Sequence, residues 1–122
     1  MLAATEADHN LRRSAVKRLT FKRAYLPLVA AGRKTQTIRR WKKPKLHAGE
    51  VVLIPNVGTA EVLSVEPVEL ADLNENDAEC EGFTSLEALI KALRSIYGDV
   101  GPFWRVRFRL LPKGVPNRRA LR

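Results

Sequence analysis

The sequence has few residues of the kinds that build disulfides and metal sites. Its 122 residues include one cysteine, Cys80, and two histidines, His9 and His47, which lie far apart in the chain. A single thiol cannot form an internal disulfide, and these three residues lack the spacing of a metal-ligand set. We therefore expect a protein that works without a metal or another cofactor.

Long hydrophobic runs are also missing. No segment approaches the length of a membrane span, and residues 1–17 lack the unbroken apolar core of a signal peptide. These absences predict a cytoplasmic protein that does not associate with membranes. The length fits one domain with its own core. We expect a flexible extension over residues 1–17, the domain over 18–111 and a basic disordered tail over 112–122.

Acidic residues are outnumbered, with 13 Asp and Glu against 22 Lys and Arg, for a net charge of +9. Residues 19–58 hold nine Lys or Arg and one Glu, a net of +8, whereas residues 59–97 hold nine acids and two basic residues, a net of −7. A strongly basic segment is typical of proteins that bind polyanions. The charges predict contact with nucleic acid, and surface ion pairs are the alternative use for them.

Strands are predicted from short apolar or alternating runs bounded by Pro, Gly and Asn. The predicted strands cover residues 19–21, 35–40, 51–54, 59–65 and 103–110. The last strand alternates between an apolar face and a face with three arginines, so we expect one side to be core and the other basic.

Three helices are predicted between these strands. A short helix over residues 25–31 has Pro27 in its first turn and Gly32 just past its end. A brief helix over 77–81 is expected to be capped by Asn76 and closed by Gly82. A longer helix begins at an expected capping box of Thr84 and Glu87 and ends near Tyr97. The pattern thus indicates a mixed α and β domain.

The segment from Gly32 to Arg40 contains the residues best suited to chemistry, since it combines four cations with two hydroxyls. On a regular strand Thr35, Thr37 and Arg39 share one face, and Lys34 lies on the other. Lys34 and Thr37 can therefore act together only if the backbone bends between Gly32 and the strand.

Three motifs resemble those of the ASCH domain family. They are Gly32-Arg33-Lys34-Thr35-x-Thr37-x-Arg39, then Asp77-Ala78-Glu79-x-Glu81-Gly82-Phe83, then Tyr97 with the closing strand 103–110. The resemblance covers roughly residues 19–110. It implies an α+β fold, a PUA-like mixed β-barrel with short flanking helices, and association with RNA or nucleosides.

Some small members of that family are amidohydrolases that remove the acetyl group of N4-acetylcytidine with a Lys, a Thr and a Glu. The resemblance assigns these catalytic roles to Lys34, Thr37 and Glu81. A threonine hydroxyl needs a base to take its proton, and an amine of lowered pKa can be that base. Alternatively, Lys34 is a solvated cation or a phosphate contact, and Glu81 is an acid in the last turn of its helix that pairs with Lys34 or Arg39.

A basic loop after Arg39 favours a polymeric ligand, and the leading hypothesis from the sequence is therefore binding of RNA or a nucleotide part of it. The amidohydrolase is the rival hypothesis, and a ribonuclease is a weaker third. The residues predicted to contact RNA are Arg33, Thr35, Arg39, Arg40, Trp41, Lys42, Lys43, Arg105 and Arg107. The alternative for Arg105 and Arg107 is the hydrated face of a strand.

Overall fold

The computed structural model describes residues 16–112 of the chain. The predicted extension and tail lie outside these residues, except at their inner ends. Lys17, which the sequence placed in the extension, belongs to the first strand of the sheet.

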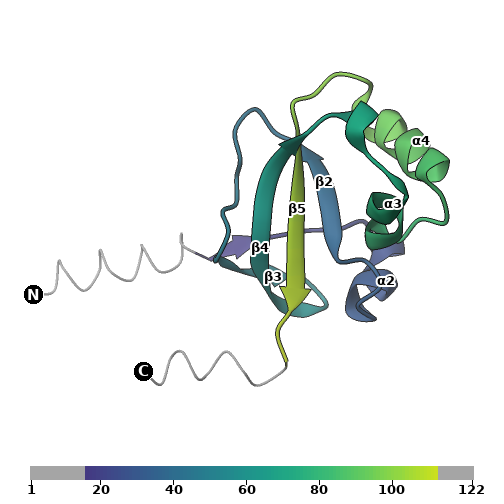
Figure 1. The fold of residues 1–122 in the computed structure, drawn as a ribbon. Helices are drawn as coiled ribbons and strands as arrows, with labels where there is room; N and C mark the ends of the chain where they lie inside the picture. Colours follow the sequence, from purple (N-terminus) through teal and green to yellow (C-terminus); the bar gives the residue numbers. More distant parts are fainter. Residues whose placement is uncertain (1–15, 113–122) are drawn as a thin grey trace, which may run out of the picture.

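A single five-stranded mixed sheet forms the centre of the fold (Figure 1). Its strands are β1 (Lys17–Arg18), β2 (Gln36–Arg40), β3 (Val51–Ile54), β4 (Gly58–Val68) and β5 (Phe103–Leu110). The order in the sheet is β1-β3-β4-β5-β2, with β1 parallel to β3 and all other pairs antiparallel. The strand β2 is therefore an edge strand with β5 on one side only.

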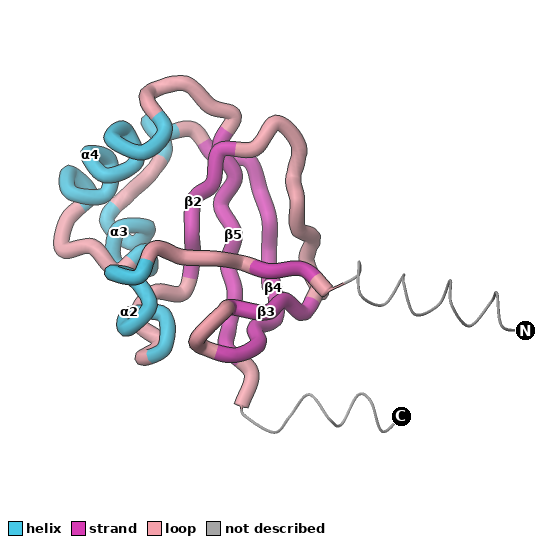
Figure 2. The backbone as a smooth tube through the Cα atoms, turned by 180° about the vertical axis from the view of Figure 1, so that it is seen from behind, coloured by secondary structure: helices cyan, strands magenta, loops and turns pink. Residues whose placement is uncertain are grey.

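The sheet curls into a half-barrel. The long strand β4 pairs with β3 and with β5, and its register against β5 shifts between Val62 and Ser64. A β-bulge of this kind bends a strand and increases its local twist. The segment that follows β1 then crosses the open side of the curled sheet, as seen from behind in Figure 2. The α+β, PUA-like fold that the resemblance implied is confirmed.

The strand predictions were correct for β3 and β5, whereas β4 begins one residue before the predicted strand over 59–65 and continues to Val68. The predicted first strand over 19–21 was wrong, because regular pairing to β3 covers Lys17 and Arg18 and ends with one more hydrogen bond, from the Leu19 N–H to the Leu53 carbonyl. The strand expected over 35–40 begins one residue later, at Gln36.

The helices lie beside β2 (Figure 1). They are a 3₁₀ turn η1 (Arg23–Tyr25), α2 (Leu26–Ala30), a 3₁₀ turn η2 (Leu70–Asp72), α3 (Glu75–Glu81) and α4 (Leu86–Tyr97). None of the helices within residues 16–112 is long and apolar enough to cross a membrane.

Two predicted caps were wrong by one or two positions. Asn74, not Asn76, caps α3, because its side chain accepts from the Asp77 N–H while the Asp77 carboxylate accepts from the Asn74 N–H. Ser85, not Thr84, caps α4 by accepting from the Ala88 N–H. The predicted and the observed capping residues are all polar residues that cap helices well, so the sequence could not decide between neighbouring candidates. Gly82 ends α3 with a φ of 88°, as predicted.

Two apolar clusters hold the domain together. The first lies inside the curled sheet and contains Val52, Ile54, Val62, Val106 and Phe108. The second lies between the other face of the sheet and the helices, and it contains Ile38, Ala78, Leu89, Leu93 and Phe103. The face of β5 that was expected to be basic is therefore partly covered by helices, and Phe103 is buried there.

Candidate active site

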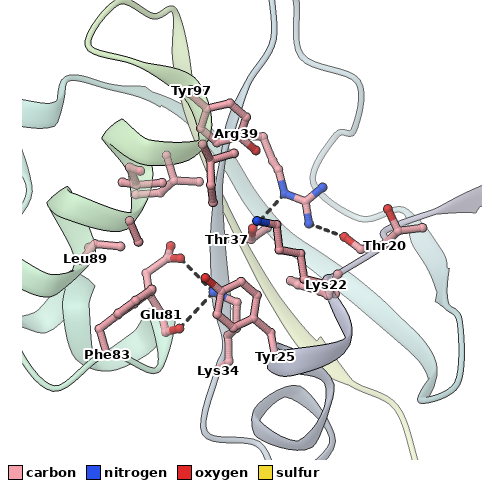
Figure 3. A pocket seen from close by; sticks show the side chains of 15 residues that line it. Thr20, Lys22, Tyr25, Lys34, Thr37, Arg39, Glu81, Phe83, Leu89 and Tyr97 are labelled. Atoms are coloured by element: carbon pink, nitrogen blue, oxygen red, sulfur yellow. Dashed lines mark hydrogen bonds and ion pairs between the residues drawn. The ribbon is translucent and has the colours of Figure 1, made fainter.

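A cavity of about 110 Å³ lies along β2, between this strand, the residues after β1 and helix α4. Its polar lining comes mainly from Lys34, Thr37, Arg39 and Glu81 (Figure 3). Thr20 and Lys22 also contribute polar groups to the lining. The rest of the wall is apolar and aromatic, formed by Phe21, Tyr25, Ile38, Phe83, Leu89, Ala92, Leu93, Ile96 and Tyr97. A mostly apolar cavity with a few converging polar groups is typical of a small-molecule site.

Lys34 and Glu81 form a buried ion pair in this cavity. The Lys34 Nζ donates to the Glu81 Oε1 and to the Glu81 main-chain carbonyl, each at 2.9 Å. The side chains are only 4% and 3% exposed. The second carboxylate oxygen, Oε2, is buried and has no hydrogen-bond partner among the described residues. Since a buried acceptor without a partner is costly, this oxygen is available to a ligand donor.

The backbone bends between Gly32 and β2, which is the condition under which Lys34 and Thr37 can act together. The N–H groups of Arg33 and Lys34 both donate to the Leu28 carbonyl, so the chain wraps around the end of α2 before it becomes extended. Gly32 has a φ of 77°, which glycine adopts at little cost. Lys34 therefore precedes the strand, and it lines the same cavity as Thr37.

A hydrogen bond ties α3 to the start of β2 and holds Glu81 opposite Lys34. The Thr35 N–H donates to the Cys80 carbonyl at 2.7 Å, one residue before Glu81. Glu81 is also the last residue of α3, which Gly82 ends. The position of the carboxylate is thus set by main-chain contacts on both partners.

Thr37 and Arg39 lie on one face of β2, as predicted, and their side chains touch. The Arg39 Nε donates to the Thr37 Oγ1 at 2.9 Å, and the Arg39 Nη2 donates to the Thr20 carbonyl at 2.6 Å (Figure 3). Because the Thr37 oxygen accepts from a cation, the threonine O–H remains free to give its proton to a base in the cavity.

Burial shifts the proton equilibrium of the ion pair. Desolvation lowers the pKa of Lys34 below its ordinary value of 10.5, although the nearby Glu81 carboxylate opposes this shift. Arg39 also lowers it slightly. Desolvation raises the pKa of Glu81, against the effect of Lys34. Both shifts favour the neutral forms, so the cavity that contains the Thr37 hydroxyl also contains a lysine that loses its proton more readily than usual.

A polar network supports α3 from the opposite side of β2. The buried Asp77 carboxylate accepts from the Gln36 Nε2 at 3.1 Å and from the Arg105 Nη1 at 2.9 Å. The Asp77 and Gln36 side chains belong to α3 and β2, so the network clamps the helix that carries Glu81 to the strand that carries Thr37.

The fold has clear relatives among solved structures. An ASCH domain from Lactobacillus crispatus JV V101 superposes with a TM-score of 0.67 at 14% identity, over 77% of this chain and 78% of that one. A protein from Enterococcus faecalis V583 superposes with a TM-score of 0.58 at 17% identity, over 91% and 94%. These likenesses concern the fold alone.

Proteins found by sequence comparison have a higher identity to this chain than these structures have. A Haemophilus influenzae (strain PittEE) protein named N(4)-acetylcytidine amidohydrolase is 32% identical over 99 residues, which are 76% of this chain and 94% of the relative. An Edwardsiella ictaluri protein with the same name is 33% identical over 90 residues, 69% of this chain and 79% of the relative. The chain belongs to the ASCH domain family. No family model matches this ASCH protein.

The structure separates the residues that the ASCH motifs and the basic loop after them singled out. Lys34, Thr37, Arg39 and Glu81 come together in the cavity. Arg33 and Thr35 instead line a different hollow, beside α3. Residues 40–43 line a third hollow with Pro44 and Lys45.

Arg105 and Arg107, which were predicted to contact RNA, lie against acidic residues of this ASCH domain. The Arg105 side chain is 17% exposed and pairs with Asp77 at 2.9 Å and with Glu66 at 3.4 Å. Arg107 is 3.9 Å from Glu66, and its Nε donates to the Gln36 Oε1 at 3.4 Å. Both arginines thus form ion pairs within the domain, and Arg105 is largely buried, unlike a residue on the hydrated face of a strand.

Sequence reasoning missed the aromatic wall of the ASCH cavity. The Lys34 Nζ lies 5.1 Å from the centroid of the Tyr25 ring and 5.9 Å from that of Phe21. Phe83 meets Tyr25 edge-on at 6.1 Å. Tyr25 and Phe21 were assigned to a short helix and a short strand, and no spacing in the sequence relates them to Lys34.

Proposed function

We propose that this protein hydrolyses the acetyl amide of N4-acetylcytidine to cytidine and acetate. The observation that carries the proposal is the buried Lys34–Glu81 pair in a cavity that also contains the Thr37 hydroxyl. The Haemophilus influenzae relative named N(4)-acetylcytidine amidohydrolase, which is matched over 94% of its length, supports the choice of substrate.

The first step is attack of the Thr37 Oγ1 on the acetyl carbonyl carbon. In its neutral form Lys34 has two N–H hydrogens, which the two Glu81 oxygens accept, and one lone pair. This lone pair takes the threonine proton as the new C–O bond forms. A tetrahedral intermediate results, with negative charge on the former carbonyl oxygen.

The second step breaks the bond between the acetyl carbon and N4. The proton on Lys34 passes to the leaving nitrogen, cytidine departs, and the acetyl group remains as an ester on Thr37. A water molecule then attacks the ester with Lys34 as base, and acetate leaves as the Thr37 hydroxyl re-forms. The free Glu81 Oε2 suits the amide N–H of the substrate as a hydrogen-bond acceptor, which orients the carbonyl toward Thr37.

The direct test is incubation of the protein with N4-acetylcytidine and separation of the products by chromatography. We expect cytidine and acetate in equal amounts from the wild type, and neither above the uncatalysed rate from the Lys34→Met variant. Binding of the nucleoside without product release by the wild type would contradict the proposed reaction.

The rate should depend on pH through the lowered pKa of Lys34. The active form is the neutral amine, so kcat/KM should rise with pH through this pKa and level off above it, with the midpoint below the ordinary lysine value of 10.5. Glu81→Gln removes a carboxylate that raises the pKa of Lys34. The midpoint of this slower variant should therefore move to lower pH. A midpoint that stays fixed or moves up would argue against Lys34 as the base.

RNA contact is a second candidate function, and the basic loop after β2 favours it. Arg40, Lys42, Lys43 and Lys45 are exposed and surround a hollow with Trp41. Within residues 16–112 none of these four cations is paired with a carboxylate. Unpaired cations around a hollow suit the phosphates of a polymer.

Binding of a short single-stranded RNA should therefore weaken steeply as salt rises. Each phosphate contact contributes about −0.7 to the slope of log K against log salt. The charge reversals Lys42→Glu and Lys43→Glu together should make the slope less negative by about 1.4. Lys91→Glu, an exposed lysine of α4, is the matched control and should cause a smaller change. A flat salt response of the wild type would contradict RNA contact.

A further inference from the structure

The free edge of β2 offers main-chain groups that the reaction described above does not use. Two hydrogen bonds fix the alternation along this strand: the Phe108 N–H donates to the Thr35 carbonyl, and the Trp41 N–H donates to the Pro102 carbonyl. In an antiparallel pair, every second residue directs both main-chain groups to its partner strand. Thr37 and Arg39 therefore face β5, and the N–H and carbonyl of Ile38 face away from it.

The cavity runs along β2, whose free edge carries these groups. Ile38 lines the cavity and is 2% exposed, and no acceptor for its N–H is found within residues 16–112. Gln36 and Arg40 have the same orientation, but neither lines the cavity. A buried N–H without a partner is rare in folded proteins, and a ligand atom is one way to satisfy it.

The position of this N–H in the chain matches a catalytic need. Ile38 directly follows Thr37, the proposed nucleophile. In enzymes with a serine on a sharp turn, the N–H of the residue after the nucleophile is one donor of the oxyanion hole, because it lies next to the carbon under attack. A donor placed where negative charge develops lowers the barrier more than one that binds the ground state.

Three cations line the cavity, Lys22, Lys34 and Arg39, and the last two already donate to other partners. The Lys34 Nζ donates to two oxygens of Glu81. The Arg39 Nε and Nη2 donate to the Thr37 hydroxyl oxygen and the Thr20 carbonyl. Unlike these groups of Lys34 and Arg39, the Ile38 N–H has no protein acceptor among the described residues, and it directly follows the proposed nucleophile.

We propose that the main-chain N–H of Ile38 is an oxyanion-hole donor for the tetrahedral intermediate. The proposal rests on the amidohydrolase function. It assigns a donor and no covalent step: when the Thr37 oxygen adds to the acetyl carbon, the carbonyl π electrons move to the oxygen, and the Ile38 N–H hydrogen-bonds to the resulting oxyanion.

The test replaces one peptide bond by an ester, with the α-hydroxy analogue of isoleucine at position 38. This change removes the N–H and keeps the side chain. It also weakens the Thr37 carbonyl as an acceptor for β5, so the matched control is an ester at position 40. That control weakens the Arg39 carbonyl as an acceptor for β5. It also removes the Arg40 N–H, which lies on the same free edge of β2, and Arg40 does not line the cavity.

We expect kcat for N4-acetylcytidine to be about 10²-fold to 10³-fold lower for the ester at 38 than for the ester at 40. KM should be similar for both. If the wild type released cytidine and the two esters had equal kcat, the role of Ile38 would be overturned but the proposed reaction would not. No cytidine release by the wild type would overturn the reaction and this role with it.

A second measurement tests the proposal even if the ester variant does not fold. In ¹⁵N-labelled Thr37→Val protein, which keeps the main chain of residue 38, addition of N4-acetylcytidine should shift the Ile38 amide proton downfield. Shifts of other amides around the cavity without a shift at Ile38 would overturn the proposal.

Discussion

We expect the Lys34→Met variant to lose the proposed turnover of N4-acetylcytidine and also to be less stable than the wild type. Loss of the general base should lower kcat by about 10⁴-fold, at the upper end of what proton transfer contributes. The methionine also leaves the Glu81 carboxylate buried without its partner, 3% exposed. Removal of one partner of a buried pair costs about 3–5 kcal/mol of unfolding free energy. Kinetics and denaturant unfolding of the same variant measure both effects.

The double variant Lys34→Met/Glu81→Met separates the two effects. Replacement of both charges removes the unpaired carboxylate, so most of the lost stability should return. Activity should stay absent, since neither the base nor the carboxylate is present. If the double variant regained activity together with stability, the loss in Lys34→Met would be a folding defect and Lys34 would not be catalytic.

Thr37→Val removes the proposed nucleophile and keeps the shape of the side chain. We expect kcat to fall by about 10⁴-fold to 10⁶-fold, the range for removal of a nucleophile or its partner in serine enzymes. The fold should lose about 1–3 kcal/mol, because the Arg39 Nε loses its acceptor in a partly buried position. Rapid quenching and mass spectrometry of the wild type should detect an acetyl group on Thr37.

Two neighbouring substitutions serve as controls for Thr37. Thr37→Ser keeps a hydroxyl and should retain measurable turnover. Thr35→Val removes an exposed hydroxyl that lines a different hollow, two residues away, and should leave kcat close to that of the wild type. An equal loss in Thr35→Val and Thr37→Val would mean that the strand start, and not the Thr37 hydroxyl, limits the reaction.

Local signals in the chain were sufficient for most elements and weakest at their ends. Gly32 and Gly82 end their helices as predicted, because a positive φ at the end of a helix favours glycine. The caps are Asn74 and Ser85 and were predicted one or two residues away, since another polar side chain that can cap equally well lies within two residues of each. The alternation of β5 gave its bounds, but did not reveal that α3 covers Arg105 with Asp77.

The sequence by itself determined the family, the α+β composition and the identity of Lys34, Thr37 and Glu81 as residues to test, because motif spacing and periodicity are local properties. Only the tertiary structure decided that these residues meet. Lys34 precedes β2 at a bend held by the Leu28 carbonyl, and Glu81 arrives from α3, 47 residues later. The free Glu81 oxygen and the free Ile38 N–H likewise depend on which strands pair and which edge stays open. Such pairing joins residues far apart in the chain, so no single segment of the sequence determines it.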